Sequence, residues 1–450
     1  MKYKLISLGC QMNFSDTERI SAVLEKEGFS ETSTDHEADI LGVIACSVRQ
    51  KAIDRIYSQI HEWNKWKDQK SLITFVSGCI LPEDEMKFLK LFDLVFRIDD
   101  LPRLPEFIRS SGVVTPLAVN SSLTPQRSVT LNNSSEFWGI TPHYKSSIVA
   151  YVPIQNGCDK FCTFCAVPYT RGREISRPRK DIINEIEKLI LKGFRSIVLL
   201  GQNVNSYGYD SSSGKADFDS LLADIGRLCD SAKEPIWVYF TSPHPADMSI
   251  SVLETIAKYK SLANQIHLPL QSGDDKILIR MNRNHCLEEY RAVVKNIREI
   301  LPEATLFTDI IVGFCGETEV QFQKTRDALE EFRFDMAYIA MYSPRPGAVA
   351  ARWTDTVSRE EKKSRLHILS DDLQTIALNQ NRKLEGFNKM VLVESNDRKS
   401  GFLFGRTEGR IPVRFKSNLN LIGEIVEVVI TNAKSLSLEA EYAKNYSLVV

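Results

Sequence analysis

Three closely spaced cysteines that follow a predicted strand place the strongest constraint on this chain. The β-like run from Ser147 to Gln155 breaks at Asn156-Gly157 and is followed at once by Cys158, Cys162 and Cys165, with the spacing C-x3-C-x2-C. An iron–sulfur cluster needs several thiolates that converge from different directions, and a tight loop of this kind can supply three of them. Because no fourth ligand lies in the loop, one iron would be left open for chemistry.

Zinc is the competing interpretation of this loop. A structural zinc site usually takes four protein ligands, and no nearby Cys or His completes the set. Three cysteines buried in an ordinary core are the other alternative. The spacing favours an iron–sulfur cluster over both.

Length, charge and cysteine usage limit the class of protein. A chain of 450 residues predicts two to four domains, and a formal net charge of -1 leaves only local patches for contact with nucleic acid. No apolar run approaches the ~20 residues that span a bilayer, and Leu5–Leu8 is shorter than the roughly 7–15 residues of a signal core. Nine cysteines without a secretion signal indicate a reducing compartment. We therefore expect a cytoplasmic protein without membrane contact.

Residues 1–112 alternate between short apolar runs and amphipathic stretches such as Ser15–Glu27 and Ser47–Lys65. The predicted strands are Tyr3–Leu8, Asp39–Ala45, Leu72–Ser77 and Phe92–Arg97. This alternation predicts a parallel sheet with helices on both faces, a small flavodoxin-like domain.

Three cysteines of this domain, Cys10, Cys46 and Cys79, each come just after the end of a predicted strand. The carboxyl ends of the strands of a doubly wound sheet line one edge, so these residues can converge on one metal centre. Cysteine is also among the most commonly buried residues, and each one taken alone fits a core position. Their shared position favours a second cluster.

After a polar segment rich in Ser, Asn and Pro at 113–146, which we interpret as a linker, the β/α pattern returns over residues 147–376. The predicted strands there are Ile148–Gln155, Ser196–Leu200, Ile236–Thr241, Gln265–Leu270, Thr305–Ile311 and Asp335–Met341. Helical stretches lie between them, for example Asp181–Lys192, Leu287–Ile300 and Glu319–Phe332. Six such units predict a partial (β/α)6 barrel with its active site at the carboxyl ends of the strands.

Polar loops follow these strands as such a site requires. Gln202, Asn203, Ser242 and Gln271 lie just past three strand ends and could bind the polar groups of a cofactor. The same residue types also mark ordinary loops. Cys229, on an apparent helix, fits a core position, whereas Cys286 and Cys315 have no partner spacing and receive no role.

Residues 377–450 carry short β-branched or aromatic runs, which predict a small antiparallel barrel. These runs are Met390–Glu394, Gly401–Arg406, Ile411–Phe415 and Gly423–Ile430. A platform for RNA is predicted from cations beside aromatic residues on the β surface. Its cations are Arg406, Arg410, Arg414 and Lys416. A solvated barrel face explains the same cations equally well.

The motifs together resemble the radical S-adenosylmethionine (SAM) methylthiotransferase family, in its tRNA-modifying (MiaB-type) branch. The resemblance is carried along nearly the whole chain by these segments: Gly9–Asn13, Cys46–Lys51, the Cys158 loop with Pro168–Arg173, Leu199–Gly208, Thr241–Pro245, Asp309–Gly313 and Tyr342–Gly347. Two departures are Cys315, where the family has Pro, and Ile44-Ala45, where it has Asn-Thr. Neither removes a cysteine of the two triads.

The resemblance implies the cofactors. Cys158, Cys162 and Cys165, with Phe164 as the aromatic residue of the loop, would hold a [4Fe–4S] cluster that binds SAM. Cys10, Cys46 and Cys79 would hold an auxiliary [4Fe–4S] cluster. One SAM would methylate a sulfide on the auxiliary cluster, and a second would yield a 5′-deoxyadenosyl radical that removes hydrogen from C2 of adenine. The C-terminal barrel would be a TRAM domain.

The implied substrate is N6-dimethylallyladenosine at position 37 of the tRNA anticodon stem-loop, where an unstacked base is reachable. The implied partners are an electron donor such as flavodoxin or ferredoxin and a donor of sulfur or clusters, and we expect a monomer. Sister enzymes that act on threonylcarbamoyladenosine or on a ribosomal protein aspartate remain alternatives. A non-catalytic iron–sulfur RNA-binding protein is the alternative from another class.

Overall fold

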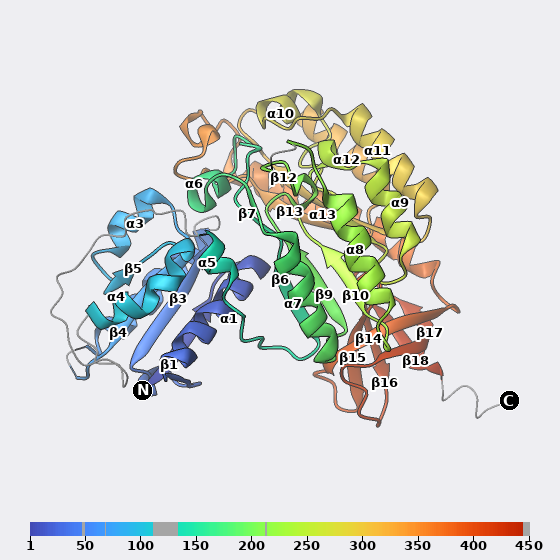
Figure 1. The fold of residues 1–450 in the computed structure, drawn as a ribbon. Helices are drawn as coiled ribbons and strands as arrows, with labels where there is room; N and C mark the ends of the chain where they lie inside the picture. The colour runs from blue at the N-terminus through green and yellow to red at the C-terminus, as the bar shows by residue number, and fades with distance from the viewer. Residues whose placement is uncertain (47–49, 68, 111–133, 212–213, 444–450) are drawn as a thin grey trace.

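The chain folds into three units, which the computed structural model arranges side by side (Figure 1). The structure describes residues 1–46, 50–67, 69–110, 134–211 and 214–443. Most of the predicted linker, and part of the segment Cys46–Lys51, lie outside these residues. In the described part of the chain, no helix is both long enough and apolar enough to cross a membrane.

The N-terminal unit is a parallel sheet in the order β2-β1-β3-β4-β5, the order of flavodoxin. Its strands are β1 (Lys2–Ser7), β2 (Ser30–Glu31), β3 (Ile40–Cys46), β4 (Ile73–Cys79) and β5 (Leu94–Val95). Its helices are α1 (Gln11–Lys26), α2 (Gln50–Asn64), α3 (Pro82–Phe88) and α4 (Leu104–Ser110), and α5 (Ser134–Trp138) follows. Alternate residues of β3 enter two separate cores, one with Ile20 of α1 and one with Ile56 of α2. The predicted helices on both faces are confirmed.

The start of α1 differs from the sequence prediction. We predicted a helix from Ser15, but it begins at Gln11, directly after Cys10. The backbone N–H of Cys10 donates to the Asn13 side chain, so the first turn closes four residues before the predicted stretch Ser15–Glu27.

The central unit has six parallel-paired strands, in the sheets β10-β9-β6 and β11-β12-β13, as a partial (β/α)6 barrel requires. The strands are β6 (Val149–Pro153), β9 (Ser196–Leu200), β10 (Trp237–Phe240), β11 (Gln265–His267), β12 (Thr305–Val312) and β13 (Met336–Met341). Two further strands, β7 (Gln155–Asn156) and β8 (Ile175–Ser176), pair antiparallel, with the loop of the three cysteines between them in the sequence. The helices are α6 (Val167–Arg171), α7 (Arg179–Leu191), α8 (Phe218–Asp230), α9 (Ile250–Lys258), α10 (Asp275–Arg280), α11 (Leu287–Ile300), α12 (Glu319–Phe332) and α13 (Arg359–Arg382).

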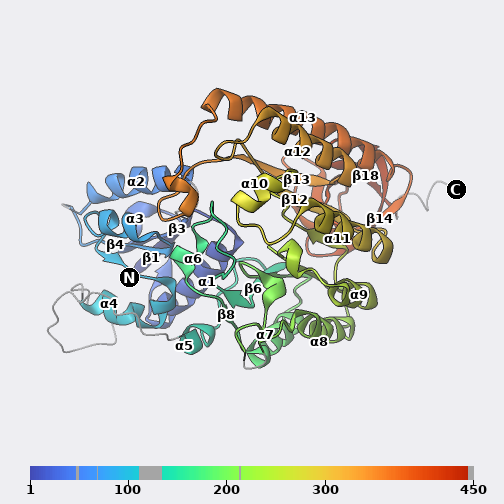
Figure 2. The same cartoon turned by 90° about the horizontal axis from the view of Figure 1, so that it is seen from above.

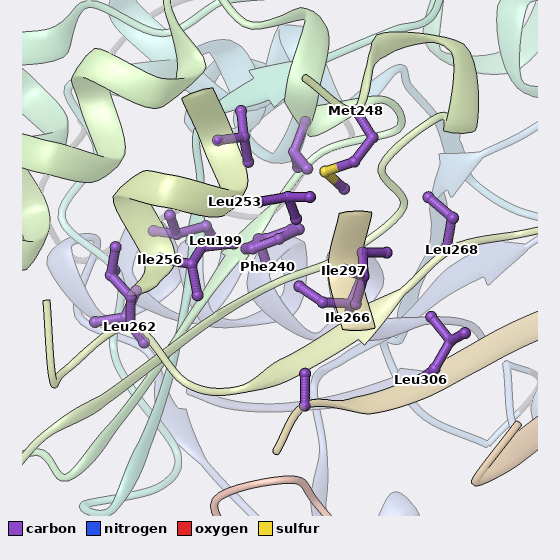
Figure 3. Packing of buried hydrophobic residues seen from close by; sticks show 14 of the residues in the cluster. Leu199, Phe240, Met248, Leu253, Ile256, Leu262, Ile266, Leu268, Ile297 and Leu306 are labelled. Atoms are coloured by element: carbon purple, nitrogen blue, oxygen red, sulfur yellow. The ribbon is translucent and has the colours of Figure 1, made fainter. Parts of the chain in front are cut away.

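Helices α7, α8, α9, α11, α12 and α13 follow one another around the outside of the strands (Figure 2). The main core lies between the two layers, where Leu199 of β9 and Phe240 of β10 meet Leu253 and Ile256 of α9 (Figure 3). Burying such side chains contributes roughly 1.5–3 kcal/mol each. This packing fixes the strand ends from which the polar loops emerge.

The C-terminal unit is a closed barrel in the order β14-β15-β16-β18-β17. Its strands are β14 (Asn388–Asn396), β15 (Phe402–Thr407), β16 (Pro412–Lys416), β17 (Ile425–Ala433) and β18 (Leu438–Tyr442). The predicted barrel is confirmed, with one strand more than the sequence indicated. That strand, β18, pairs parallel with β16, whereas the other neighbours in the barrel are antiparallel.

Buried charges join α1 to the central unit. Arg19 is fully buried and approaches Glu185 of α7, whose carboxylate also pairs with Arg177. Glu18, 4% exposed, accepts a hydrogen bond from the backbone N–H of Lys145 at 3.0 Å. A buried charge that loses its partner is strongly destabilising, so these contacts fix how the two units dock.

The carboxyl of Glu18 predicts how stability depends on pH. Burial raises the pKa of Glu18 from 4.5 to about 7, with the neighbouring Glu185 adding to the increase. The folded state therefore holds a proton that the unfolded chain releases, so this group's contribution to stability is present below pH 4.5 and is lost as the pH rises to 7. We expect Glu18→Gln to stabilise the protein above pH 7 by about 3 kcal/mol and to have little effect near pH 4.5.

Melting temperatures of the parent and Glu18→Gln at pH 5 and pH 8 test this expectation. Glu62→Gln, on the exposed side of α2 and 56% exposed at its side chain, controls for the loss of one negative charge. An equal effect of Glu18→Gln at both pH values would show that the variant acts through packing alone.

Candidate functional site

The cysteines of the N-terminal unit gather at the carboxyl edge of its sheet. Cys46 and Cys79 end β3 and β4 and are direct partners in the strand register. Asn13 brings the loop after β1 to the same edge, because its side chain accepts from the backbone of Cys10 and donates to the carbonyl of Ala45 at 2.6 Å. Gly9 is so close that a Cβ there would lie 3.0 Å from the Cβ of Cys46. We call Cys10, Cys46 and Cys79 the N-terminal triad.

The loop of Cys158, Cys162 and Cys165, the core triad, is held from several sides. Gly157 has a φ of +82° and a Cβ there would lie 2.0 Å from the carbonyl oxygen of Arg173, so the entry to the loop needs glycine. The side chain of Asn282 donates to the carbonyls of Lys160 and Phe161 at 3.2 and 3.1 Å. These contacts fix the loop before any cofactor binds.

Each triad offers sulfur ligands with hydrogen-bond donors around them. Burial raises the pKa of Cys158 to about 11 and the pKa of Cys79 and Cys165 to about 12. These thiols are neutral near pH 7 until iron displaces their protons. N–H donors lie 3.5 Å or less from three of the sulfurs: Arg283 to Cys162, Val167 to Cys165 and Arg171 to Cys79. This donor set fits thiolate-ligated clusters.

No compact group of three or more His, Cys, Asp or Glu side chains that could hold a single metal ion occurs among the residues described. An iron–sulfur cluster is a larger body than one ion, and its thiolate ligands surround several irons.

The predicted cofactor residues divide into two groups. The side-chain oxygens of Gln202, Asn203 and Gln271 are buried and have no hydrogen-bond partner within the described residues. A buried amide oxygen without a partner is costly, and a bound polar ligand would satisfy it. The other group has no such buried oxygen. Ser242 lies at the surface, in a left-handed conformation with φ +57°. Phe164 packs against an apolar cluster that contains Met281 and Phe314.

Two charged residues beside the Asn203 amide, Lys160 and Asp247, were missed from the sequence. The ammonium of Lys160 pairs with Asp247 at 2.6 Å, and Asp247 also accepts from the Asn203 amide at 3.0 Å. His244 accepts from the backbone of Ala246, and burial lowers the pKa of its imidazole far below the ordinary value, so it is neutral. Ion pairs between loops of different strands leave no local sequence signal.

The predicted RNA-binding cations occupy different positions. Arg406 pairs with Glu394, and Arg414 pairs with Asp397 at 2.9 Å. The guanidinium of Arg410 lies 4.0 Å from the ring centre of Tyr239, against the central unit. Lys416 is exposed at the end of β16.

Cys315, the departure from the family motif, is fully buried beside Phe314, and its sulfur lies 3.8 Å from the Ala350 carbonyl oxygen. Cys229 is buried in the main core of the central unit, as expected.

Three family models match the chain. The Radical SAM superfamily matches residues 152–329, the uncharacterized protein family UPF0004 matches 2–97, and the TRAM domain matches 382–443. Each model covers one of the three units.

Curated relatives are similar over nearly the full length. The chain is 38% identical over 447 residues to a protein of Chlorobium limicola, covering 99% of this chain and 98% of the relative. It is 36% identical over 442 residues to one of Ruthia magnifica subsp. Calyptogena magnifica, covering 97% and 98%. Both relatives are named tRNA-2-methylthio-N(6)-dimethylallyladenosine synthase.

Solved structures share the fold at low identity. The radical SAM methyltransferase TsrM from Kitasatospora setae aligns with a TM-score of 0.54 at 13% identity, covering 78% of this chain and 75% of that one. The cobalamin-dependent radical SAM enzyme OxsB aligns with a TM-score of 0.50 at 14% identity, covering 83% and 56%.

Proposed function

This chain belongs to the radical SAM methylthiotransferases of the tRNA-2-methylthio-N(6)-dimethylallyladenosine synthase family, and we propose how its residues serve that activity. It is an enzyme of tRNA modification that inserts a methylthio group at C2 of N6-dimethylallyladenosine at position 37, beside the anticodon. The observation that carries this function is the similarity to such synthases along nearly the whole chain. The sister substrates and the non-catalytic alternative have no comparable support.

The core triad holds the [4Fe–4S] cluster that binds SAM, and the N-terminal triad holds an auxiliary [4Fe–4S] cluster. Thiolate donors, loops fixed by backbone contacts and nearby N–H groups support both assignments. When bound, the two clusters supply the electron that cleaves SAM and the sulfur that is inserted. The protein positions both triads.

Gln202, Asn203 and Gln271 bind the polar groups of SAM. Support for this comes from their three unpartnered amide oxygens, buried at the strand ends of the central unit. Lys160 and Asp247 hold the adjoining loops in place. Ser242 and Phe164 have weaker support, since the hydroxyl lies at the surface and the ring packs in an apolar cluster.

The TRAM barrel contributes to binding the tRNA. Lys416 is the best supported of the predicted cations because it is exposed, whereas Arg406, Arg410 and Arg414 already have partners. The proposed domains are the N-terminal unit at 1–112, the linker at 113–146, the central unit at 147–376 and the C-terminal barrel at 377–450. The proposed partners are an electron donor such as flavodoxin or ferredoxin and a donor of sulfur or clusters. We also propose that the protein is a monomer in the cytoplasm.

Reconstitution with a defined tRNA tests the function. The protein is loaded anaerobically with iron and sulfide and given SAM, reductant and prenylated tRNA that lacks the methylthio group. Digestion and mass spectrometry should then reveal a prenylated adenosine that has gained a methylthio group, and omission of the reductant should abolish it. Deoxyadenosine without modified tRNA would redirect the assignment to the sister substrates, and neither product at full iron loading would favour the binding protein.

A further inference from the structure

Arg171, the last residue of α6, lies buried against the N-terminal triad. Its side chain is 2% exposed, and its Nε donates to the Sγ of Cys79 at 3.0 Å. Arg171 belongs to the central unit and Cys79 to the N-terminal unit, so this contact crosses the boundary between them (Figure 1).

The orientation of this guanidinium is fixed by two further partners. One terminal nitrogen pairs with the carboxylate of Asp16, which is 1% exposed, and the other lies 3.4 Å from the side-chain oxygen of Asn156. Asn156 is held in turn by its own donation to Asp99 at 3.2 Å. The three guanidinium nitrogens thus contact three residues, and the terminal nitrogen near Asn156 also lies 3.5 Å from the second carboxylate oxygen of Asp16, an arrangement that lysine cannot reproduce.

The same short helix also touches the core triad. α6 begins at Val167, two residues after Cys165, and the Val167 N–H donates to the Cys165 sulfur at 3.4 Å. One continuous segment therefore donates hydrogen bonds to a sulfur of each triad.

We propose that Arg171 is a positioning residue that orients Cys79 and raises the reduction potential of the auxiliary cluster. The proposal rests on the assignment of that cluster under the proposed function. Hydrogen bonds to the sulfur ligands tune the potential of iron–sulfur clusters, and a cation stabilises the reduced form, which carries one more negative charge. Burial of the cluster has the opposite effect and lowers its reduction potential. Without Arg171, nothing at Cys79 would oppose this effect of burial.

The test isolates the auxiliary cluster. In a full-length background with Cys158→Ala, Cys162→Ala and Cys165→Ala, the midpoint potential is measured by redox titration followed by electron paramagnetic resonance, together with iron and sulfide content. Asp16→Asn is compared with Asp16→Asn/Arg171→Met, because the pair of changes removes Arg171 without leaving a buried unpaired carboxylate. Arg173→Met, two residues further along and paired with Asp159, is the matched arginine control.

We expect the double variant to keep its iron and to have a more negative potential than Asp16→Asn, by at least a tenfold change in the redox equilibrium, about 59 mV for a one-electron couple. Asp16→Asn itself should shift to a more positive potential, because it removes a buried negative charge beside Cys79, and Arg173→Met should stay near the parent potential. Arg171→Lys, which keeps the charge but loses the fixed N–H donors, should have a more negative potential than the parent.

A fully loaded double variant with the same potential as Asp16→Asn would overturn the proposal, as would a shift in Arg173→Met equal to the difference between those two variants. If the double variant loses its cluster, Arg171→Lys decides the question, and a potential equal to the parent's would likewise overturn it. If the variant that lacks only the core triad holds no cluster, the assignment of the auxiliary cluster is overturned, and the inference about Arg171 with it.

Discussion

Replacing Cys158, Cys162 and Cys165 with alanine is expected to remove about half of the iron and to abolish the formation of 5′-deoxyadenosine from SAM. The three sulfurs come from one loop whose shape Gly157 and Asn282 fix without the cofactor, so the rest of the fold should survive their loss. Iron analysis and chromatography of the SAM products provide the measurement.

Cys229→Ala is the matched control for this experiment. Cys229 is 2% exposed and belongs to the main core, away from both triads. Its truncation should leave iron content and SAM cleavage unchanged and cost only stability, on the order of 1 kcal/mol. Unchanged iron in the triple variant would refute the assignment of the core triad.

Replacing Cys10, Cys46 and Cys79 with alanine should have the complementary outcome. Because the core triad lies in another unit, we expect deoxyadenosine to form still, while the methylthio product disappears and about half of the iron is lost. Cys286→Ala, at the start of α11, controls for the removal of a partly exposed thiol. Methylthio product from the triple variant would show that the sulfur does not depend on the N-terminal triad.

Most of the fold could be predicted from the sequence because hydrophobic periodicity is local. The helices Leu287–Ile300 and Glu319–Phe332 have the predicted bounds, since each begins at a capping box and presents one apolar face. Helix α13 was missed, because its polar composition over Arg359–Arg382 gives little periodic signal. Strand β18 alternates apolar and polar residues, but it has only five residues, and three of them are Glu or Ala, which are uncommon in strands.

The site could be predicted only where topology alone decides it. Strands of a parallel sheet end at one edge, so residues following β1, β3 and β4 had to come near one another. The contact from Arg171 to Cys79 spans 92 residues and depends on how two units dock, which no local pattern records. For the same reason the predicted cation Arg410 gave no sign that it faces Tyr239 of the central unit. The pairing of Arg406 with Glu394 lies within the barrel and depends on the register between β14 and β15.

The buried charges of α1 also bear on how the chain is made. Asp16 and Arg19 leave the ribosome more than 150 residues before their partners Arg171 and Glu185 are synthesised. Until then a carboxylate and a guanidinium on α1 must stay hydrated, because an unpaired buried charge is too costly. The N-terminal sheet can form early, as domains do during translation, but this face of it matures only when the central unit arrives.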